Sequence, residues 1–209
     1  MTKAWMRIVI GASIAGGGLA VAGPANATMW RNYLNESKCL ASGNNGSMSP
    51  GEGLVIWDCN IDQHKPVADQ DWGEVAAPFN SSFVELYDTK APSPAQVGFG
   101  DNSPARCMGP TDGDYLNGWQ LIIWTCNSAT EGHDQGWHPF FQRYDGQGHA
   151  CYTFTNELAA ENPGYSPRLN QVFGVSGANM TNGTPVIMWQ YFEDSSGRPT
   201  HLDQVWCAY

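Results

Sequence analysis

Three copies of one short motif carry the side chains best suited to chemistry in this sequence. Each copy reads Asp, Gln, one variable residue and Trp, at residues 69–72, 134–137 and 203–206. The carboxylate and the amide form hydrogen bonds, and the indole offers a large apolar surface. One such motif would mean little. Three copies, each 13 to 17 residues after the Trp of a similar strand, indicate an internal repeat.

Other kinds of reactive site find no support in the residue spacing. The five histidines show no metal-ligand pattern, and there is no G-x-S-x-G elbow for a nucleophilic serine. No cysteine pair is spaced C-x-x-C, which argues against zinc and thiol redox chemistry. Counting alone does not exclude a glycosidase-type carboxylate pair, but nothing indicates a deep cleft. We therefore expect a non-enzymatic protein without metal or cofactor, with an enzyme as the least favoured alternative.

The strands that must position these motifs also recur three times. They are Val55–Trp57, Ile122–Trp124 and Ile187–Trp189, and a turn with Gly51, Gly118 or Gly183 precedes each one. Glycine supplies the positive φ that a tight hairpin turn requires. No stretch has sustained helical periodicity, so alternating short strands and turns predict a closed all-β fold. Three similar units imply pseudo-threefold closure, because one unit alone cannot bury its tryptophan face.

Composition and the N-terminal residues indicate an exported, acidic protein. The 209 residues carry a net charge of −10, which disfavours nucleic acid as a partner. Lys3 and Arg7 precede an apolar run, and Ala25–Ala27 matches an A-x-A cleavage site. We expect a signal peptide over residues 1–27, cleaved after Ala27, and no other membrane span. The secreted part, residues 28–209, would be one domain with repeats over about 28–75, 76–140 and 141–209.

Export places the six cysteines in an oxidising compartment, so three disulfides are expected. The repeat register pairs Cys39 with Cys59 and Cys107 with Cys126, and leaves Cys151 with Cys207, although sequence alone does not prove this connectivity. The third repeat is irregular, because Tyr191 stands where its second cysteine should be. Either the segment 140–144 leading to Cys151 or the segment 169–175 opens that repeat.

The order Cys-Leu, Trp-x-Cys-Asn and Gln-x-Trp resembles the ricin B-chain-like β-trefoil lectins, over residues 30–209. The resemblance implies a twelve-stranded trefoil with up to three shallow sites, usually for galactose-type sugars. In such a site a carboxylate or amide holds sugar hydroxyls, and an aromatic ring stacks on the C–H face. The family places an Asp two residues after the first cysteine of each repeat.

This sequence departs from the family pattern at that Asp. The corresponding residues are Ala41, Gly109 and, in the third repeat, Gly174 or Thr153. The usual galactose site is therefore in doubt in every repeat. Asp112 and Asp114 would substitute only with a changed loop.

We expect the remaining candidates to divide between core and site. The motif tryptophans Trp72, Trp137 and Trp206 fit the core, and the motif glutamines fit hydrogen bonds within each repeat. The motif aspartates fit a turn cap or a sugar contact equally. The strand-end tryptophans fit the core or a pocket wall, and Trp119 fits an exposed stacking platform or partial burial. The candidate carbohydrate-binding set is Trp57, Asp69, Gln70, Trp119, Trp124, Asp134, Gln135, Trp189, Asp203 and Gln204.

Two partner classes follow from the resemblance. The first is a glycan or a cell-surface glycoconjugate. The alternative is a secreted protein partner, with the trefoil serving as a toxin binding subunit that has lost sugar binding. In that case the extra loops around residues 76–104 and 152–168 would form the partner surface, and a large exposed aromatic patch would favour it.

Overall fold

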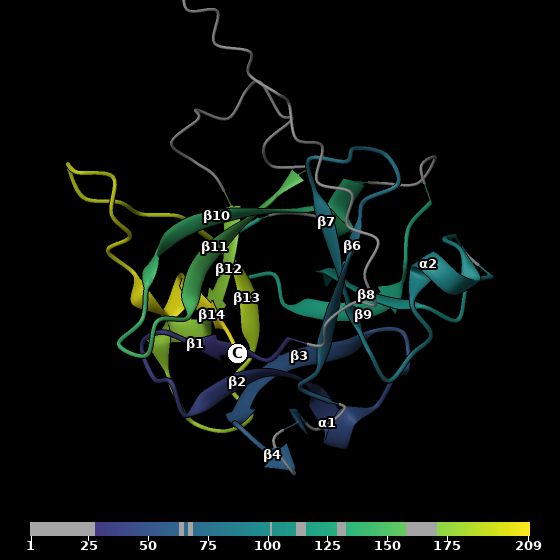
Figure 1. Ribbon diagram of the computed structural model, residues 1–209, viewed down its shortest axis with the longest axis horizontal. Coiled ribbons are helices and arrows are strands. Elements are labelled where there is room, and N and C mark those ends of the chain that lie inside the picture. The colour runs from purple at the N-terminus through teal and green to yellow at the C-terminus, as the bar shows by residue number, and fades with distance from the viewer. Residues whose placement is uncertain are drawn as a thin grey trace, which may run out of the picture.

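The computed structural model describes residues 28–62, 65–66, 69–100, 102–111, 116–128, 133–157 and 171–209. The expected signal peptide over residues 1–27, the acids Asp112 and Asp114, and residues 158–168 of the expected partner loop lie outside them. The described part is almost entirely strands and turns, as the lack of helical periodicity predicts (Figure 1).

Twelve strands form one continuous sheet in three sets of four. The first set is β1 (Trp30–Asn32), β2 (Lys38–Ser42), β3 (Glu52–Asp58) and β6 (Trp72–Ala76). The second is β7 (Val84–Asp88), β8 (Arg106–Pro110), β9 (Leu121–Thr125) and β10 (Trp137–Tyr144). The third is β11 (Ala150–Asn156), β12 (Gln171–Val175), β13 (Val186–Gln190) and β14 (Trp206–Ala208).

Short elements lie between these strands. Two four-residue helices, three 3-10 turns and a separate pair of two-residue strands complete the described elements: α1 (Gly43–Gly46), α2 (Pro94–Val97), η2 (His133–Gln135), η3 (Ser176–Ala178), η4 (Leu202–Gln204), β4 (Ile61–Asp62) and β5 (Lys65–Pro66).

The first and last strands of the three sets form a closed barrel. Antiparallel pairs run β1–β14, β14–β11, β11–β10, β10–β7 and β7–β6. An isolated bridge between Thr28 and Trp72 joins the chain before β1 to β6 and completes the ring. The middle strands form three hairpins, β2–β3, β8–β9 and β12–β13 (Figure 1). Six barrel strands with three hairpins are a β-trefoil, which confirms the predicted fold.

The hairpin registers show which segment opens the third repeat. Cys39 pairs with Trp57 and Cys107 pairs with Trp124, and at the same position Val172 pairs with Trp189. Gln171–Val175 is therefore the third hairpin strand, and Gly174 is its counterpart of Ala41 and Gly109. Residues 140–144 belong to β10, and Cys151 belongs to β11 of the barrel.

The motif tryptophans form the centre of the core. Trp72, Trp137 and Trp206 are fully buried. Each indole N–H donates to a backbone carbonyl on the hairpin strand of its own repeat, with nitrogen–oxygen distances of 3.1, 3.0 and 3.3 Å to Leu40, Met108 and Phe173. A buried indole needs such a partner, so these bonds fix each ring between barrel and hairpin. The expected core role is confirmed.

All three expected disulfides are present, Cys39–Cys59, Cys107–Cys126 and Cys151–Cys207. The first two lie within their own hairpin repeats. The third joins β11 to β14, because Val172 and Tyr191 occupy the hairpin positions in the last repeat. That repeat is therefore cross-linked in the barrel, and the segment that directly follows β13 lacks the disulfide that follows β3 and β9.

Candidate functional site

Three equivalent pockets lie beside the hairpins, one per repeat. Each contains the strand-end Trp, the aliphatic residue two positions before it, the motif Asp and the Ala or Gly that replaces the family Asp. We call them site 1 (about 330 Å³), site 2 (about 530 Å³) and site 3 (about 430 Å³). These shared members are Ala41, Val55, Trp57 and Asp69; Gly109, Ile122, Trp124 and Asp134; and Gly174, Ile187, Trp189 and Asp203.

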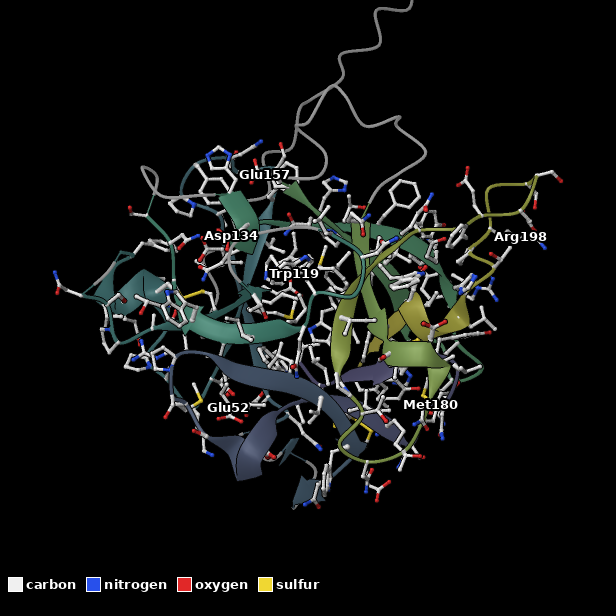
Figure 2. The ribbon with its side chains drawn as sticks, turned by 180° about the vertical axis from the view of Figure 1, so that it is seen from behind. Glu52, Trp119, Asp134, Glu157, Met180 and Arg198 are labelled. Carbon is white, nitrogen blue, oxygen red and sulfur yellow. A yellow bond between two sulfur atoms is a disulfide. The ribbon has the colours of Figure 1, made fainter. Side chains whose placement is uncertain are left out.

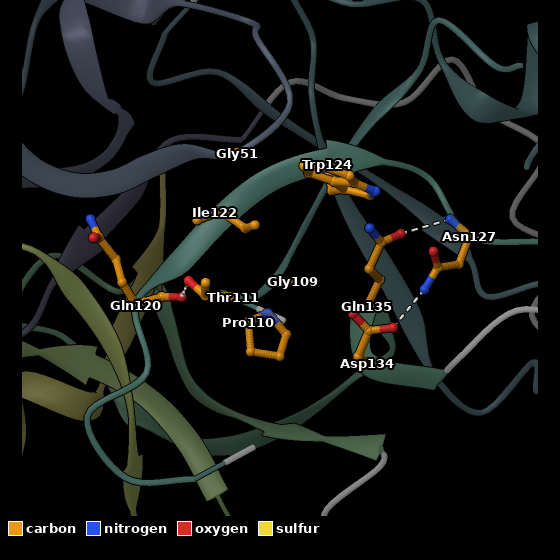
Figure 3. A pocket seen from close by; sticks show the side chains of 10 residues that line it. All are labelled: Gly51, Gly109, Pro110, Thr111, Gln120, Ile122, Trp124, Asn127, Asp134 and Gln135. Carbon is orange, nitrogen blue, oxygen red and sulfur yellow. Dashed lines mark hydrogen bonds between the residues drawn. The ribbon is translucent and has the colours of Figure 1, made fainter. Parts of the chain in front are cut away.

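The strand-end tryptophans form pocket walls and not core. The exposed fractions of Trp57, Trp124 and Trp189 are 48, 48 and 39%. The cause is the two-residue alternation of a strand. Leu54 and Ile56 point inward and are fully buried, so Val55 and Trp57 face outward. The same alternation holds in β9 and β13. Figure 3 shows Trp124 across the mouth of site 2 from Asp134.

Each Trp also contacts the glycine turn of a neighbouring repeat. A Cβ added to Gly183 would lie 3.6 Å from Trp57, one added to Gly51 would lie 3.7 Å from Trp124, and one added to Gly118 would lie 4.0 Å from Trp189. All three glycines have positive φ, between 84° and 90°. Gly183 lines site 1 and Gly51 lines site 2, so two repeats build each of these sites, whereas the described lining of site 3 comes from the third repeat alone.

Backbone hydrogen bonds dock these turns at the same three places. The amides of Gly51, Gly118 and Gly183 donate to carbonyls of the neighbouring strand, with distances of 2.8, 2.8 and 2.9 Å to Ile123, Met188 and Ile56. Main-chain hydrogen bonds therefore fix the contact between neighbouring repeats, and they hold the glycine turn beside each strand-end Trp in place.

In sites 2 and 3 the motif Asp places its carboxylate close to the Gly that stands at the position of the family Asp. A Cβ at Gly109 would lie 3.4 Å from Asp134 Oδ2, and one at Gly174 would lie 3.2 Å from Asp203 Oδ2. These are the positions from which the family Asp would project. The carboxylate of Asp134 or Asp203 therefore comes from the turn before β10 or β14. It lies close to the space that the side chain of the family Asp would occupy. In site 2, Asn127 Nδ2 donates to Asp134 Oδ1 at 2.6 Å.

The motif glutamines bond to the backbone of their own repeats, and Gln135 also lines site 2. Gln70, Gln135 and Gln204 are buried. Gln135 accepts from the amide of Asn127 at 2.7 Å and donates to the carbonyl of Thr125 at 2.9 Å (Figure 3 shows the first bond). Gln70 makes the equivalent pair with Asn60 and Asp58. The amides of Gln70 and Gln135 are therefore engaged with backbone groups on both sides, and the carbohydrate-binding role expected of the motif glutamines stays a prediction.

Gln204 keeps only part of this arrangement. Its amide nitrogen donates to the carbonyl of Gln190 at 2.9 Å, while its buried Oε1 has no hydrogen-bond partner in the described chain. The third repeat therefore holds its motif glutamine by one bond fewer than the other two.

Trp119 does not belong to the candidate site. Its ring is partly buried and packs against the main core cluster, and it lines none of the three pockets. Its carbonyl accepts from the amide of Met188, so the residue lies at the seam between the second and third repeats (Figure 2). The turn glycine before it directs the chain onto β13, which brings the ring inward.

The three sites differ in their polar lining and in electrostatics. Ser42 lines site 1, Thr111 and Gln120 line site 2, and Ser176 and His201 line site 3. Burial raises the pKa of Asp203 above its ordinary value. No Lys or Arg is among the described residues that line these pockets. The sites are therefore neutral or acidic.

The outward aliphatic residues Val55, Ile122 and Ile187 and the role of the turn glycines were not predicted from the sequence. The available signal was the position two residues before each exposed Trp, which must lie on the same strand face. Within the described chain, one group of metal-type side chains comes together, Glu85 with Cys107 and Cys126. The two cysteines form a disulfide with each other and offer no thiolate.

No described helix has the length and apolar character needed to cross a membrane. No protein-family model and no curated protein sequence matches the chain.

Solved structures share its fold at low sequence identity. The designed threefold-symmetric protein ThreeFoil is 15% identical with a TM-score of 0.59, over 87% of this chain and 96% of that one. The Rhizoctonia solani agglutinin is 14% identical with a TM-score of 0.52, over 88% and 98%.

Two larger proteins contain a similar unit. The exo-β-1,3-galactanase 1,3Gal43A from Clostridium thermocellum is 17% identical, with a TM-score of 0.58, over 87% of this chain. A mosquitocidal holotoxin is 14% identical, with a TM-score of 0.52, over 88%. The chain spans only 29% and 17% of these two proteins. Together the likenesses show that the chain folds as a β-trefoil.

Proposed function

We propose that the protein is a secreted, non-enzymatic carbohydrate-binding protein of the ricin B-chain-like type, with three working sites. One observation carries the proposal: a half-exposed Trp shares a pocket with a carboxylate at three equivalent places. The ring stacks on the C–H face of a sugar, and the carboxylate accepts from hydroxyls on its edge. An agglutinin and a galactanase, each containing a similar trefoil, are in keeping with this role.

The pockets favour a neutral sugar over an anionic one. The chain has a net charge of −10, each pocket contains an Asp, and no described lining residue is Lys or Arg. A sulfated sugar or a uronic acid would meet repulsion without a compensating cation. The outward aliphatic residue at the position of Val55 gives each pocket an apolar floor, which suits a methyl or methylene group of the sugar.

The test is a glycan array probed with the full chain, expressed in a secreting host so that its disulfides form. A variant with Trp57, Trp124 and Trp189 all changed to Ala should lose binding and keep its fold. Phe140→Ala/Tyr144→Ala is the matched control, since it removes exposed aromatic rings outside the three pockets. A blank array from folded wild-type protein would refute the proposal.

One observation favours the alternative, a protein-binding module. Strand β10 exposes Phe140, Phe141 and Tyr144 by 57, 46 and 66%, and the last two rings lie 5.1 Å apart. Adjacent exposed aromatic rings are typical of interaction surfaces. The patch lies on the barrel strand and not on the loops expected for a partner. Capture of a secreted protein by the wild type and the triple Trp variant, but not by Phe140→Ala/Tyr144→Ala, would support this role.

A further inference from the structure

The third repeat differs from the other two immediately after its strand-end Trp. Tyr191 replaces the hairpin cysteine, and Phe192 stands where the first two repeats have Asn60 and Asn127. The chain from this Trp to the motif Trp is also the longest of the three. The loop that follows β13 projects from the body of the trefoil, with Arg198 on it (Figure 2).

This loop encloses a second cavity next to site 3. The cavity has a volume of about 410 Å³ and begins at Gln190, the residue after Trp189. Its wall includes Phe192 and Glu193. An aromatic ring together with hydrogen-bond acceptors repeats the chemistry that the three sites share.

Phe192 connects the two cavities. Its ring lies 5.0 Å from that of His201 at an interplanar angle of 33°, and His201 lines site 3 together with Trp189. Phe192 is 38% exposed, and the side chain of His201 is 49% exposed. Trp189 and His201 therefore line site 3, and Phe192 lies against His201 and lines the second cavity.

The loop holds Phe192 in place through its own hydrogen bonds. The carbonyl of Phe192 accepts from the amide of Thr200 at 2.9 Å, and the amide of Asp194 donates to the carbonyl of Arg198 at 2.8 Å. The Asp194 carboxylate also accepts from the Ser196 amide at 2.8 Å. A loop whose backbone is held before binding loses little entropy when a ligand arrives, which favours affinity.

We propose that site 3 binds an oligosaccharide of at least two sugar residues, the first against Trp189 and Asp203 and the second against Phe192. The inference rests on the proposed carbohydrate-binding function. Sites 1 and 2 have an Asn at the position of Phe192, so they take a single sugar residue by the same geometry. Site 3 is therefore the one whose affinity depends on glycan length.

The experiment isolates site 3 in a variant with Trp57→Ala and Trp124→Ala. Titration calorimetry compares the methyl glycoside, disaccharide and tetrasaccharide of β-1,3-linked galactose, β-1,4-linked N-acetylglucosamine and α-1,2-linked mannose. We expect the disaccharide of the preferred series to bind about five- to tenfold more tightly than the methyl glycoside, as one aromatic contact allows.

Phe192→Ala on that background should bring the affinity ratio of disaccharide to methyl glycoside to about one, so that the length dependence is lost. Phe192→Tyr should retain it, and Phe140→Ala, remote from the pockets, should have no effect. The inference would be overturned by equal affinity for the methyl glycoside, disaccharide and tetrasaccharide, or by a length dependence that survives Phe192→Ala. In either case binding of the monosaccharide would still uphold the proposed function. If no glycan binds the folded wild type, both proposals fail.

Discussion

Replacing Gly109 with Ala tests why the family Asp is missing from site 2. The new Cβ would lie 2.9 Å from Gln135 Cγ, closer than real Cβ atoms approach another carbon. Gln135 cannot move freely, because its amide bonds the backbone of Asn127 and Thr125. Gly109 does not have a positive φ, so any strain comes from this contact and not from the backbone. A longer side chain such as Asp would meet the same obstacle.

The expected cost follows from three contributions. Overpacking a tight site costs about 1–3 kcal/mol, and weakening one Gln135 hydrogen bond costs about 1 kcal/mol. Ala also lowers the conformational entropy of the unfolded chain, which stabilises the folded state by about 0.4–1 kcal/mol. Gly109→Ala should therefore destabilise the protein by about 1–3.5 kcal/mol.

Gly174→Ala and Gly146→Ala are the matched comparisons. A Cβ at Gly174 would lie 2.8 Å from Gln204 Cγ, but Gln204 is held by one bond and can shift more easily. We expect its cost to be about 1 kcal/mol smaller than that of Gly109→Ala, the value of one bond. A Cβ at Gly146 would meet nothing within 4 Å, so that variant should be neutral or slightly stabilised.

Urea unfolding followed by tryptophan fluorescence, with disulfides intact, measures all three variants. The midpoint should fall at an unchanged m-value, since the substitution alters packing and not the surface exposed on unfolding. If Gly109→Ala is as stable as Gly146→Ala, the glutamine does not occlude the floor. The family Asp would then be absent for a reason other than space, and our account of site 2 would be wrong.

Three further outcomes follow from burial and charge. In urea titrations, Trp124→Ala should stay within about 1 kcal/mol of wild type, whereas Trp137→Ala should cost about 3–5 kcal/mol because that ring is fully buried. Burial raises the pKa of Asp88 to about 6, so the folded state keeps a proton that the unfolded chain releases near pH 4. Unfolding free energy should thus fall by roughly 3 kcal/mol from about pH 4 to 6, and Asp88→Asn should flatten that fall. Burial also raises the pKa of Asp203. As the pH is lowered, Asp203 should therefore take up a proton at a higher pH than an ordinary Asp does. Glycan affinity at site 3, measured by calorimetry in the Trp57→Ala/Trp124→Ala variant, should weaken at that pH.

The fold was predictable because its signals repeat in the sequence. Turn glycines, motif tryptophans and cysteine spacing recur in register, and each recurrence is a packing requirement of the same unit. The direction of Trp57 was not predictable in the same way. Val55, Ile56 and Trp57 are all apolar, so alternation is hidden, and only the closed barrel determines which strand face is inside.

The other features that the sequence did not predict each have a particular structural cause. Val172 replaces a cysteine in the third repeat, so the pattern that marks the hairpin strand is lost there, and Gly174 had no sequence marker. Trp119 follows a turn glycine as Glu52 does, and its inward direction depends on β13 of the next repeat. The contact between Gly109 and Gln135 joins residues far apart in the chain, and no local pattern records it.

In each site, the contacts that position the Trp and the Asp differ from the polar residues that line the pocket. We call the Trp, the Asp and the contacts that position them the frame of the site. Strand alternation and a neighbouring glycine turn orient the indole, and a buried glutamine next to the motif Asp bonds to the backbone. These contacts belong to the trefoil itself and are nearly the same three times. The polar lining, by contrast, differs from site to site, since Ser42, Thr111 and His201 differ in size and hydrogen-bonding character. Since the frame sets the class of ligand and the lining sets the preference within it, the three sites should bind one chemical class with three selectivities.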